Sequence, residues 1–228
     1  MIKTVLLDLD DTLFDFHRAE ATAIADTFKE MGIESTEEII RLYSGINQSQ
    51  WERLERGEID RDEVRVGRFE ILFEKLGRDV DAFKTQQKYE YNLGCYHFYI
   101  DGAVDLLEAI YQKYDLYIIS NGTDSVQKRR IAASGIKKYF KEIFISENVG
   151  YNKPAVEFFD RCFAKIPNFD KAFAIIIGDS PSSDILGGKN VGVRTCRFNP
   201  KGKPNPENIT PDYEVSSLAD IIPLLESL

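Results

Sequence analysis

MIKTVLLDLDDTLF, residues 1–14, places a short run of Val, Leu and Ile directly before a cluster of aspartates. Such an apolar run is typical of a central strand in a parallel sheet that helices cover on both faces. Ligands bind sheets of this kind beyond the carboxyl ends of the strands. We therefore expect Asp8 and Asp10 to lie at a ligand-binding edge.

Asp8 and Asp10 are two residues apart, so in an extended chain both side chains leave the same face. Carboxylates this close repel each other, and each then favours a proton or a metal ion. Mg²⁺ takes oxygen ligands and would relieve the repulsion. An isolated Asp-x-Asp usually marks a solvated turn, but its place at the end of the first apolar strand favours a functional site.

The composition is that of a globular protein and argues against a polyanionic partner. The chain has 228 residues, of which 43% are hydrophobic, and a formal charge of −9. This charge opposes nonspecific binding to nucleic acid or anionic membranes. The first apolar run is unlike a signal peptide, and no stretch approaches the roughly 20 apolar residues that span a bilayer. We expect a cytoplasmic protein, with its oligomeric state left open.

Two kinds of hydrophobic pattern divide the chain. Residues 16–98 show helical periodicity without strand-like runs, which predicts an all-helical cap. Beyond them strands and helices alternate, which predicts an α/β, Rossmann-like, doubly wound parallel sheet built from residues 1–15 and 99–228. The later strand candidates are DLYIISNG (115–122), EIFISENVG (142–150), AFAIIIG (172–178) and VRTCRF (193–198).

Four predicted strands end in polar residues, and parallel strands bring these ends to one edge. There a carboxylate can attack phosphorus, while a second carboxylate protonates the leaving oxygen and later activates water. Asp8 fits the first role and Asp10 the second. The four ends are Asp8-x-Asp10, Ser120-Asn121-Gly122, the loop reaching Lys153-Pro154, and Gly178-Asp179-Ser180 with Asp184.

The predicted attack brings anionic oxygens against a carboxylate, so positive charge is needed. Mg²⁺ held by Asp8, the backbone carbonyl of Asp10 and Asp179, together with the Lys153 ammonium, can supply it. Each of these residues also has a plainer interpretation. Lys153 can be a solvated lysine, and Asp179 and Asp184 can be turn and helix-cap residues.

Ser120-Asn121-Gly122 is the candidate phosphate-binding segment. The Ser120 hydroxyl and the backbone amides of Asn121 and Gly122 offer hydrogen bonds to phosphate oxygens. The same three residues can form a simple turn. Their coincidence with the other strand ends favours phosphoryl transfer.

The core motifs resemble those of the haloacid dehalogenase-like superfamily of phosphohydrolases in order and approximate spacing: DLDDT (8–12), Ser120-Asn121, Lys153-Pro154 and GDSPSSD (178–184). The resemblance covers the whole core and implies Mg²⁺ dependence and an aspartyl-phosphate intermediate. It implies these roles: Asp8 as nucleophile, Asp10 as general acid and base, Ser120 and Lys153 as phosphate binders, Asp179 as metal ligand, and Asp184 as a residue that binds metal through water or only orients the site.

The inserted segment resembles the helical cap of the superfamily's first cap class. Segments in both parts are similar to the house-cleaning pyrimidine 5′-nucleotidase branch, which implies nucleoside monophosphate substrates, noncanonical ones included: NQSQW (47–51), VGRFE (66–70), DILGG (184–188) and VSSL (215–218). Asn47, Trp51 and Arg68 are candidate substrate contacts. Trp51 also fits the core of the cap, and Asn47 and Arg68 also fit a solvated helix face.

Three other functions are compatible with the same fold. A phosphoglycolate phosphatase or another sugar-phosphate phosphatase would differ only in its cap residues. A 2-haloacid dehalogenase is disfavoured by Asp10, because displacing halide requires neither a protonated leaving group nor a metal. A noncatalytic phosphate-binding module is disfavoured because all four strand-end motifs are complete.

Overall fold

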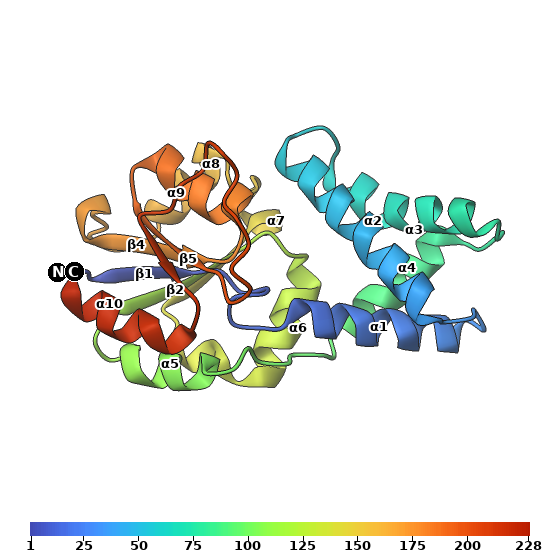
Figure 1. Ribbon diagram of the computed structural model, residues 1–228, viewed down its shortest axis with the longest axis horizontal. Coiled ribbons are helices and arrows are strands. Elements are labelled where there is room, and N and C mark those ends of the chain that lie inside the picture. Colours follow the sequence, from blue (N-terminus) through green and yellow to red (C-terminus); the bar gives the residue numbers. More distant parts are fainter. The chain divides into compact units, whose positions relative to one another are not determined.

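The computed structural model describes residues 1–228 and divides into two compact units. One unit, the core, consists of Met1–Asp15 and Phe98–Leu228, and the other, the cap, consists of Phe16–His97 (Figure 1). The cap is thus inserted into the chain of the core directly after the first strand and its aspartates.

The core contains a six-stranded, entirely parallel sheet with the strand order β3-β2-β1-β4-β5-β6. The chain runs outward from β1 in one direction and then in the other, which makes the sheet doubly wound, as predicted. The strands are β1 (Thr4–Leu7), β2 (Asp115–Ser120), β3 (Glu142–Ile145), β4 (Ala174–Gly178), β5 (Arg194–Phe198) and β6 (Tyr213–Val215).

The register of the three central strands aligns their polar ends. Leu7 pairs with Ile118 of β2 and with Ile177 of β4. Asp8 follows Leu7 directly, and Ser120 and Asp179 each lie two residues beyond their strand's paired isoleucine. All three therefore lie at the carboxyl edge of the sheet. Asp8 and Asp179 follow the neighbouring strands β1 and β4, between which the winding of the sheet reverses.

Helices cover both faces of this sheet (Figure 1). Val5 and Leu7 pack with α5 and α10 on one face, and Leu6 packs with α8 on the other. This alternation follows from the period of two along a strand. The helices are α5 (Ala103–Ile110), α6 (Asp124–Ser134), α7 (Ser146–Val149), α8 (Val156–Phe163), α9 (Leu186–Val191) and α10 (Ile221–Ser227), with short turns η1 (Ile136–Tyr139), η2 (Lys171–Phe173), η3 (Pro181–Ile185) and η4 (Leu218–Asp220).

The cap is all-helical, as its periodicity predicts, and consists of four helices. Thr36 and Asp60 cap the second and third helices, and Asp60 forms a reciprocal capping box with Glu63. Gly77 ends the third helix with a φ of 61°, a conformation that glycine adopts without a Cβ clash. The helices are α1 (Phe16–Glu30), α2 (Glu37–Glu55), α3 (Arg61–Leu76) and α4 (Ala82–Leu93).

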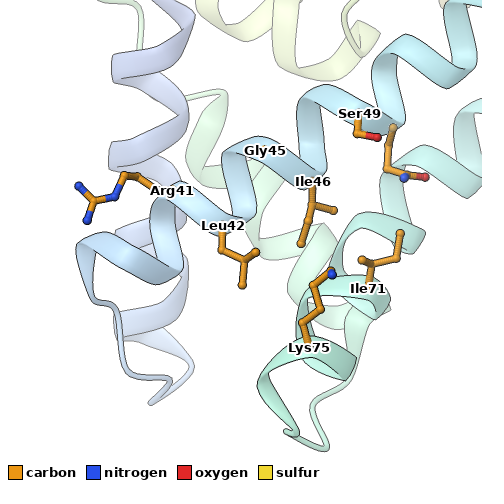
Figure 2. A pocket seen from close by; sticks show the side chains of 8 residues that line it. Arg41, Leu42, Gly45, Ile46, Ser49, Ile71 and Lys75 are labelled. Atoms are coloured by element: carbon orange, nitrogen blue, oxygen red, sulfur yellow. The ribbon is translucent and has the colours of Figure 1, made fainter.

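The cap has its own aromatic core and an open groove. Tyr43, Phe69 and Tyr89 are fully buried, and the ring centroids of Tyr43 and Phe69 lie 5.2 Å apart. Figure 2 shows the groove between α2 and α3, with a volume of about 370 Å³ and with Arg41, Ile46 and Lys75 in its lining. None of the helices in the structure has the length and apolar character needed to cross a bilayer.

Candidate active site

Asp8 is the buried carboxylate at the end of the central strand. Its backbone N–H donates to the Ile177 carbonyl at 2.9 Å, which continues the sheet ladder by one residue. The carboxylate accepts hydrogen bonds from Lys153 Nζ at 2.7 Å and from Thr12 Oγ1 at 3.2 Å. Thr12 Oγ1 also accepts from the Asp179 N–H at 3.1 Å, so this threonine ties the loop after β1 to the loop after β4.

Lys153 is 1% exposed and has all three of its ammonium donors engaged. Nζ donates to Asp8 Oδ1, to Asp184 Oδ1 at 2.6 Å and to the Ile119 carbonyl at 3.0 Å. The Asn121 side chain fixes the Lys153 backbone, donating to its carbonyl at 2.9 Å and accepting from its N–H at 2.8 Å. Lys153 is therefore a fixed positive charge and not a solvated lysine.

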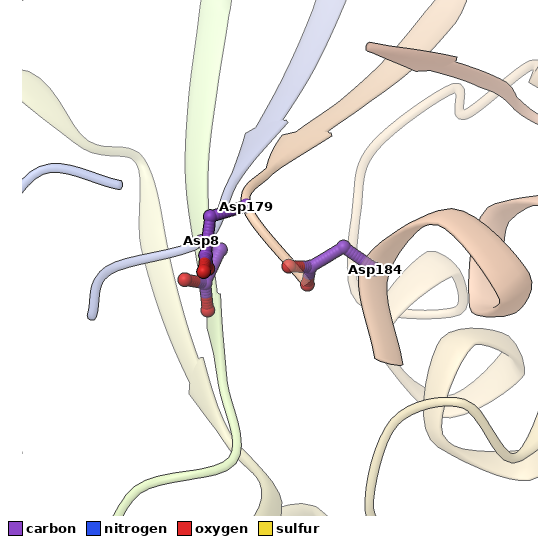
Figure 3. Close-up of side chains that lie close together, drawn as sticks. All are labelled: Asp8, Asp179 and Asp184. Atoms are coloured by element: carbon purple, nitrogen blue, oxygen red, sulfur yellow. The ribbon is translucent and has the colours of Figure 1, made fainter. Parts of the chain in front are cut away.

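Three carboxylates meet beside this lysine. Oxygen atoms of Asp8, Asp179 and Asp184 all lie within 4.8 Å of one another (Figure 3). Asp184 belongs to the π-helical turn η3 and accepts a hydrogen bond from the Ser180 N–H at 3.2 Å. A Cβ on Gly178 would lie 2.2 Å from Asp184 Oδ2, so only glycine leaves room for this carboxylate.

The electrostatics of this acidic cluster favour a bound cation. Burial raises the pKa of Asp8 to about 7, against the opposing charge of Lys153 and with a further contribution from Asp184. Burial, followed by the charges of Asp8 and Asp184, also raises the pKa of Asp179 well above its ordinary value. These carboxylates are difficult to ionise at the same time. They therefore form a set of oxygen ligands suited to a hard cation such as Mg²⁺.

The environment of Lys153, by contrast, favours the charged form of its side chain. Burial by itself would lower the pKa of Lys153, but the charges of Asp184 and Asp8 outweigh burial and raise the pKa above its ordinary value. The ammonium therefore stays charged at neutral pH and partly compensates the acidic cluster.

Asp10 lies outside the acidic cluster. Its Oδ1 accepts from Arg130 NH1 and its Oδ2 accepts from Gln127 Nε2, both at 2.5 Å. Asp11 has a φ of 58°, so the chain is no longer extended beyond Asp10. The structure therefore groups Asp184 with Asp8 and Asp179, and turns the Asp10 carboxylate toward α6.

Ser120 presents a hydrogen-bond donor. Its Oγ accepts from Gln127 Nε2 at 2.9 Å and from the Gly122 N–H at 3.1 Å. A hydroxyl accepts two hydrogen bonds and donates one, so the remaining O–H is available for another acceptor. Such a donor at the carboxyl edge of the sheet suits a phosphate oxygen.

Gln127 and Arg130 are not among the residues expected from the sequence. Their signal is a Gln and an Arg three residues apart, one turn along a helix that directly follows a strand-end motif. Thr12, inside the first motif, was likewise not expected to link two loops. Each contact depends on how segments distant in sequence fold together.

The structure places the three candidate cap residues within the cap. Asn47 and Arg68 are buried, and Arg68 NH1 donates to Asn47 Oδ1 at 2.8 Å. Asn47 Nδ2 in turn donates to Glu20 Oε1 at 2.6 Å. Trp51 is half-buried, with the Arg61 guanidinium 5.5 Å from its ring centroid. Contact of Asn47, Trp51 and Arg68 with a substrate stays a prediction.

A doubly wound sheet that carries a buried aspartate, a fixed lysine and two further acids at its carboxyl edge is suited to an enzyme that uses a carboxylate nucleophile. Residues 5–198 match the family described as haloacid dehalogenase-like hydrolase. The chain belongs to this family.

Relatives of known name extend the comparison. The chain is 41% identical to YfnB of Bacillus subtilis, described as a HAD-hydrolase, over 98% of this chain and 95% of that protein. It is 36% identical to the pyrimidine 5′-nucleotidase PynA of Streptococcus pneumoniae (98% and 95%) and 33% identical to the pyrimidine 5′-nucleotidase YjjG of Escherichia coli (97% and 96%). A crystal structure of YfnB bound to magnesium superposes with a TM-score of 0.94, covering 98% of both chains.

Proposed function

We propose that this chain is a phosphomonoesterase that hydrolyses nucleoside 5′-monophosphates, with pyrimidine nucleotides as the preferred class and noncanonical ones included. The observation that carries the proposal is the meeting of Asp8, Lys153, Asp179 and Asp184 at one edge of the sheet. The nucleotide class is supported by the likeness to PynA and YjjG, which extends over nearly the whole chain.

The first half of the proposed reaction transfers the phosphoryl group to Asp8. A carboxylate oxygen of Asp8 attacks phosphorus and forms a new P–O bond, while the bond from phosphorus to the ester oxygen breaks. The departing oxygen takes the proton of the Asp10 carboxylic acid and leaves as the nucleoside hydroxyl. Lys153 and the Ser120 hydroxyl provide a positive charge and a donor for the phosphoryl oxygens.

The second half releases phosphate. Water attacks phosphorus as the Asp10 carboxylate takes its proton, and the bond between phosphorus and Asp8 breaks. Asp8 regains its carboxylate and Asp10 its proton, so the sum is one phosphate ester plus water giving one alcohol plus inorganic phosphate.

The carboxylates of Asp8, Asp179 and Asp184 would hold Mg²⁺, together with the backbone carbonyl of Asp10 expected from the sequence. Bound there, the ion supplies positive charge that offsets the repulsion between the substrate phosphate and the acidic side chains. The metal site and the phosphate site share Asp8, which makes hydrolysis dependent on the ion.

A phosphate-release screen at matched concentration tests the proposed substrate class. The panel contains pyrimidine and purine 5′-monophosphates, phosphoglycolate and other sugar phosphates, with 2-chloropropionate as a haloacid. We expect the highest kcat/KM with pyrimidine 5′-monophosphates and no halide release. A clear preference for sugar phosphates would overturn the nucleotidase assignment, and halide release would overturn the phosphatase mechanism.

A further inference from the structure

The carboxylate of Asp10 is held on both oxygens by one turn of α6. We propose that Gln127 and Arg130 are positioning residues, which fix the orientation in which Asp10 exchanges its proton with the leaving group and with water. The inference rests on the proposed phosphomonoesterase function and on three hydrogen bonds within the core.

The three side chains form a closed ring. Arg130 NH1 donates to Asp10 Oδ1 at 2.5 Å and to Gln127 Oε1 at 3.0 Å, and Gln127 Nε2 donates to Asp10 Oδ2 at 2.5 Å. A carboxylate with one donor on each oxygen cannot rotate without losing a hydrogen bond. One of these donors is charged, which makes its bond the stronger.

Arg130 is itself held in place. The side chain is 0% exposed, and its guanidinium carbon lies 5.0 Å from the centroid of the Phe14 ring. Phe14 is buried in the core, and its carbonyl accepts a hydrogen bond from the Asp11 N–H at 2.7 Å, next to Asp10. Here a buried cation is paired with a partly exposed carboxylate. Because burying the charge offsets much of the Coulomb energy gained, such a pair contributes more to orienting the carboxylate than to the stability of the fold.

Gln127 connects Asp10 to the predicted phosphate-binding hydroxyl. Its single Nε2 group has two hydrogens, of which one goes to Asp10 Oδ2 and the other to Ser120 Oγ. A Cβ on Gly122 would lie 2.3 Å from this nitrogen, so glycine at 122 leaves room for the bridge. This bridge therefore sets the spacing between the Asp10 carboxyl group and the Ser120 hydroxyl, which is predicted to donate a hydrogen bond to a phosphate oxygen.

Misplacing a general acid affects substrates unequally. A nucleoside 5′-oxygen is a poor leaving group and needs the proton of Asp10, whereas p-nitrophenolate leaves without one. The kcat/KM value reports steps up to the first irreversible one, here phosphoryl transfer to Asp8, so the later attack of water does not enter it. The ratio of kcat/KM for uridine 5′-monophosphate to that for p-nitrophenyl phosphate is therefore a specific readout of Asp10 orientation.

The test measures this ratio with saturating Mg²⁺ in Arg130→Met, Arg130→Lys and Gln127→Met. Asp10→Asn provides the reference. Lys128→Met provides the matched control, because Lys128 lies on the same helix with its side chain 64% exposed and forms an ion pair with Asp124 of that helix. We expect the ratio to fall on the order of 10- to 100-fold in Arg130→Met and Gln127→Met, in the direction of Asp10→Asn. Arg130→Lys should recover part of the loss, and Lys128→Met should equal the wild type.

Thermal unfolding of each variant separates orientation from folding. An equal loss with both substrates in a folded Arg130→Met protein would show a structural role and overturn the inference, as would an unchanged ratio. If Arg130→Met does not fold, Gln127→Met and Arg130→Lys decide by the same criterion. The proposed function fails separately: wild-type protein would then release no phosphate from any alkyl ester, whatever the behaviour of the variants.

Discussion

Asp8 is an acid in a position that disfavours its charge. In the metal-free protein, burial raises the pKa of Asp8 from the ordinary 3.8 to about 7. Between these pH values the folded state therefore binds more protons than the unfolded state. The free energy of unfolding must then fall as the pH rises through this window and level off above it. A site built to hold a cation is thus less stable without one.

Asp8→Asn tests this penalty. The amide cannot ionise, so we expect the variant to gain stability over metal-free wild type as the pH rises from 3.8 to 7, by on the order of a few kcal/mol at neutral pH. Thermal or urea unfolding across this range measures the difference, with the exposed Asp101→Asn as control. A difference between Asp8→Asn and wild type that stays constant with pH would contradict the burial penalty.

Gly178→Ala tests the space reserved for Asp184. The added methyl would lie 2.2 Å from Asp184 Oδ2, so the Asp184 carboxylate must shift, and its hydrogen bond from Lys153 is disturbed. We expect a loss of about 1–3 kcal/mol in the free energy of unfolding, together with weaker Mg²⁺ binding by calorimetry. Gly67→Ala, in the helix α3 with no atom within 4 Å of the new Cβ, is the control and should not be destabilised. Unchanged Mg²⁺ affinity in Gly178→Ala would argue against Asp184 as a ligand.

At the scale of elements, the cap helices share a buried polar network. Glu20 of α1 accepts from Ser44 and Asn47 of α2, and Asn47 accepts from Arg68 of α3. Burial raises the pKa of Glu20, against the hydrogen bonds from Ser44 and Asn47. Such a network fixes the relative positions of three helices only while every member keeps its partner.

Asn47→Leu breaks the network at its centre. The substitution removes one donor to Glu20 and the acceptor of Arg68 NH1, which leaves buried polar atoms without those bonds. We expect the free energy of unfolding to fall by about 1–3 kcal/mol, measured by thermal unfolding. Gln48→Leu, an exposed neighbour on the same helix, should have little effect. Equal effects of the two substitutions would mean that the network contributes little to cap stability.

At the scale of the whole molecule, the sequence could predict the arrangement of the core because its signals are local. The run before Asp8 has the apolar continuity of a central strand, and the polar ends at Ser120, Lys153 and Asp179 follow strands whose parallel alignment puts them at one edge. The helical periodicity of residues 16–98 likewise predicts a helical insertion.

Other parts of the site could not be predicted, because they depend on contacts between distant segments. The direction of the Asp10 side chain follows from the positive φ at Asp11 and from donors on α6, more than 100 residues away. Asp184 is expected at this edge from its motif, but whether its carboxylate joins Asp8 and Asp179 directly depends on the π-helical turn η3, which no pattern in the sequence marks. Asn47 and Arg68 suit either a solvated face or a cleft by sequence, and only folding shows that they bond to each other.

Binding of Mg²⁺ affects both the stability of the whole protein and its activity. Ligand binding to the folded state alone stabilises it, by about 2.7 kcal/mol at a free Mg²⁺ concentration 100 times Kd. We expect Mg²⁺ to raise the Tm and EDTA to abolish hydrolysis, which fresh Mg²⁺ restores. Asp184→Asn should lose most of the Mg²⁺-dependent rise in Tm, whereas Asp220→Asn, at an exposed position away from the acidic cluster, should keep it. Hydrolysis that persists undiminished in EDTA would count against the proposed metal site.

The central claim is that Asp8 forms a covalent bond to phosphorus, and trapping that bond is the most direct test. Wild-type protein and the Asp10→Asn variant would be mixed with uridine 5′-monophosphate and Mg²⁺, quenched in acid, reduced with borohydride and digested for peptide mass spectrometry. Reduction converts an aspartyl-phosphate to homoserine, and we predict homoserine at position 8 only in samples that received substrate. Steady phosphate release with unmodified Asp8, or homoserine at position 10 in its place, would contradict the mechanism.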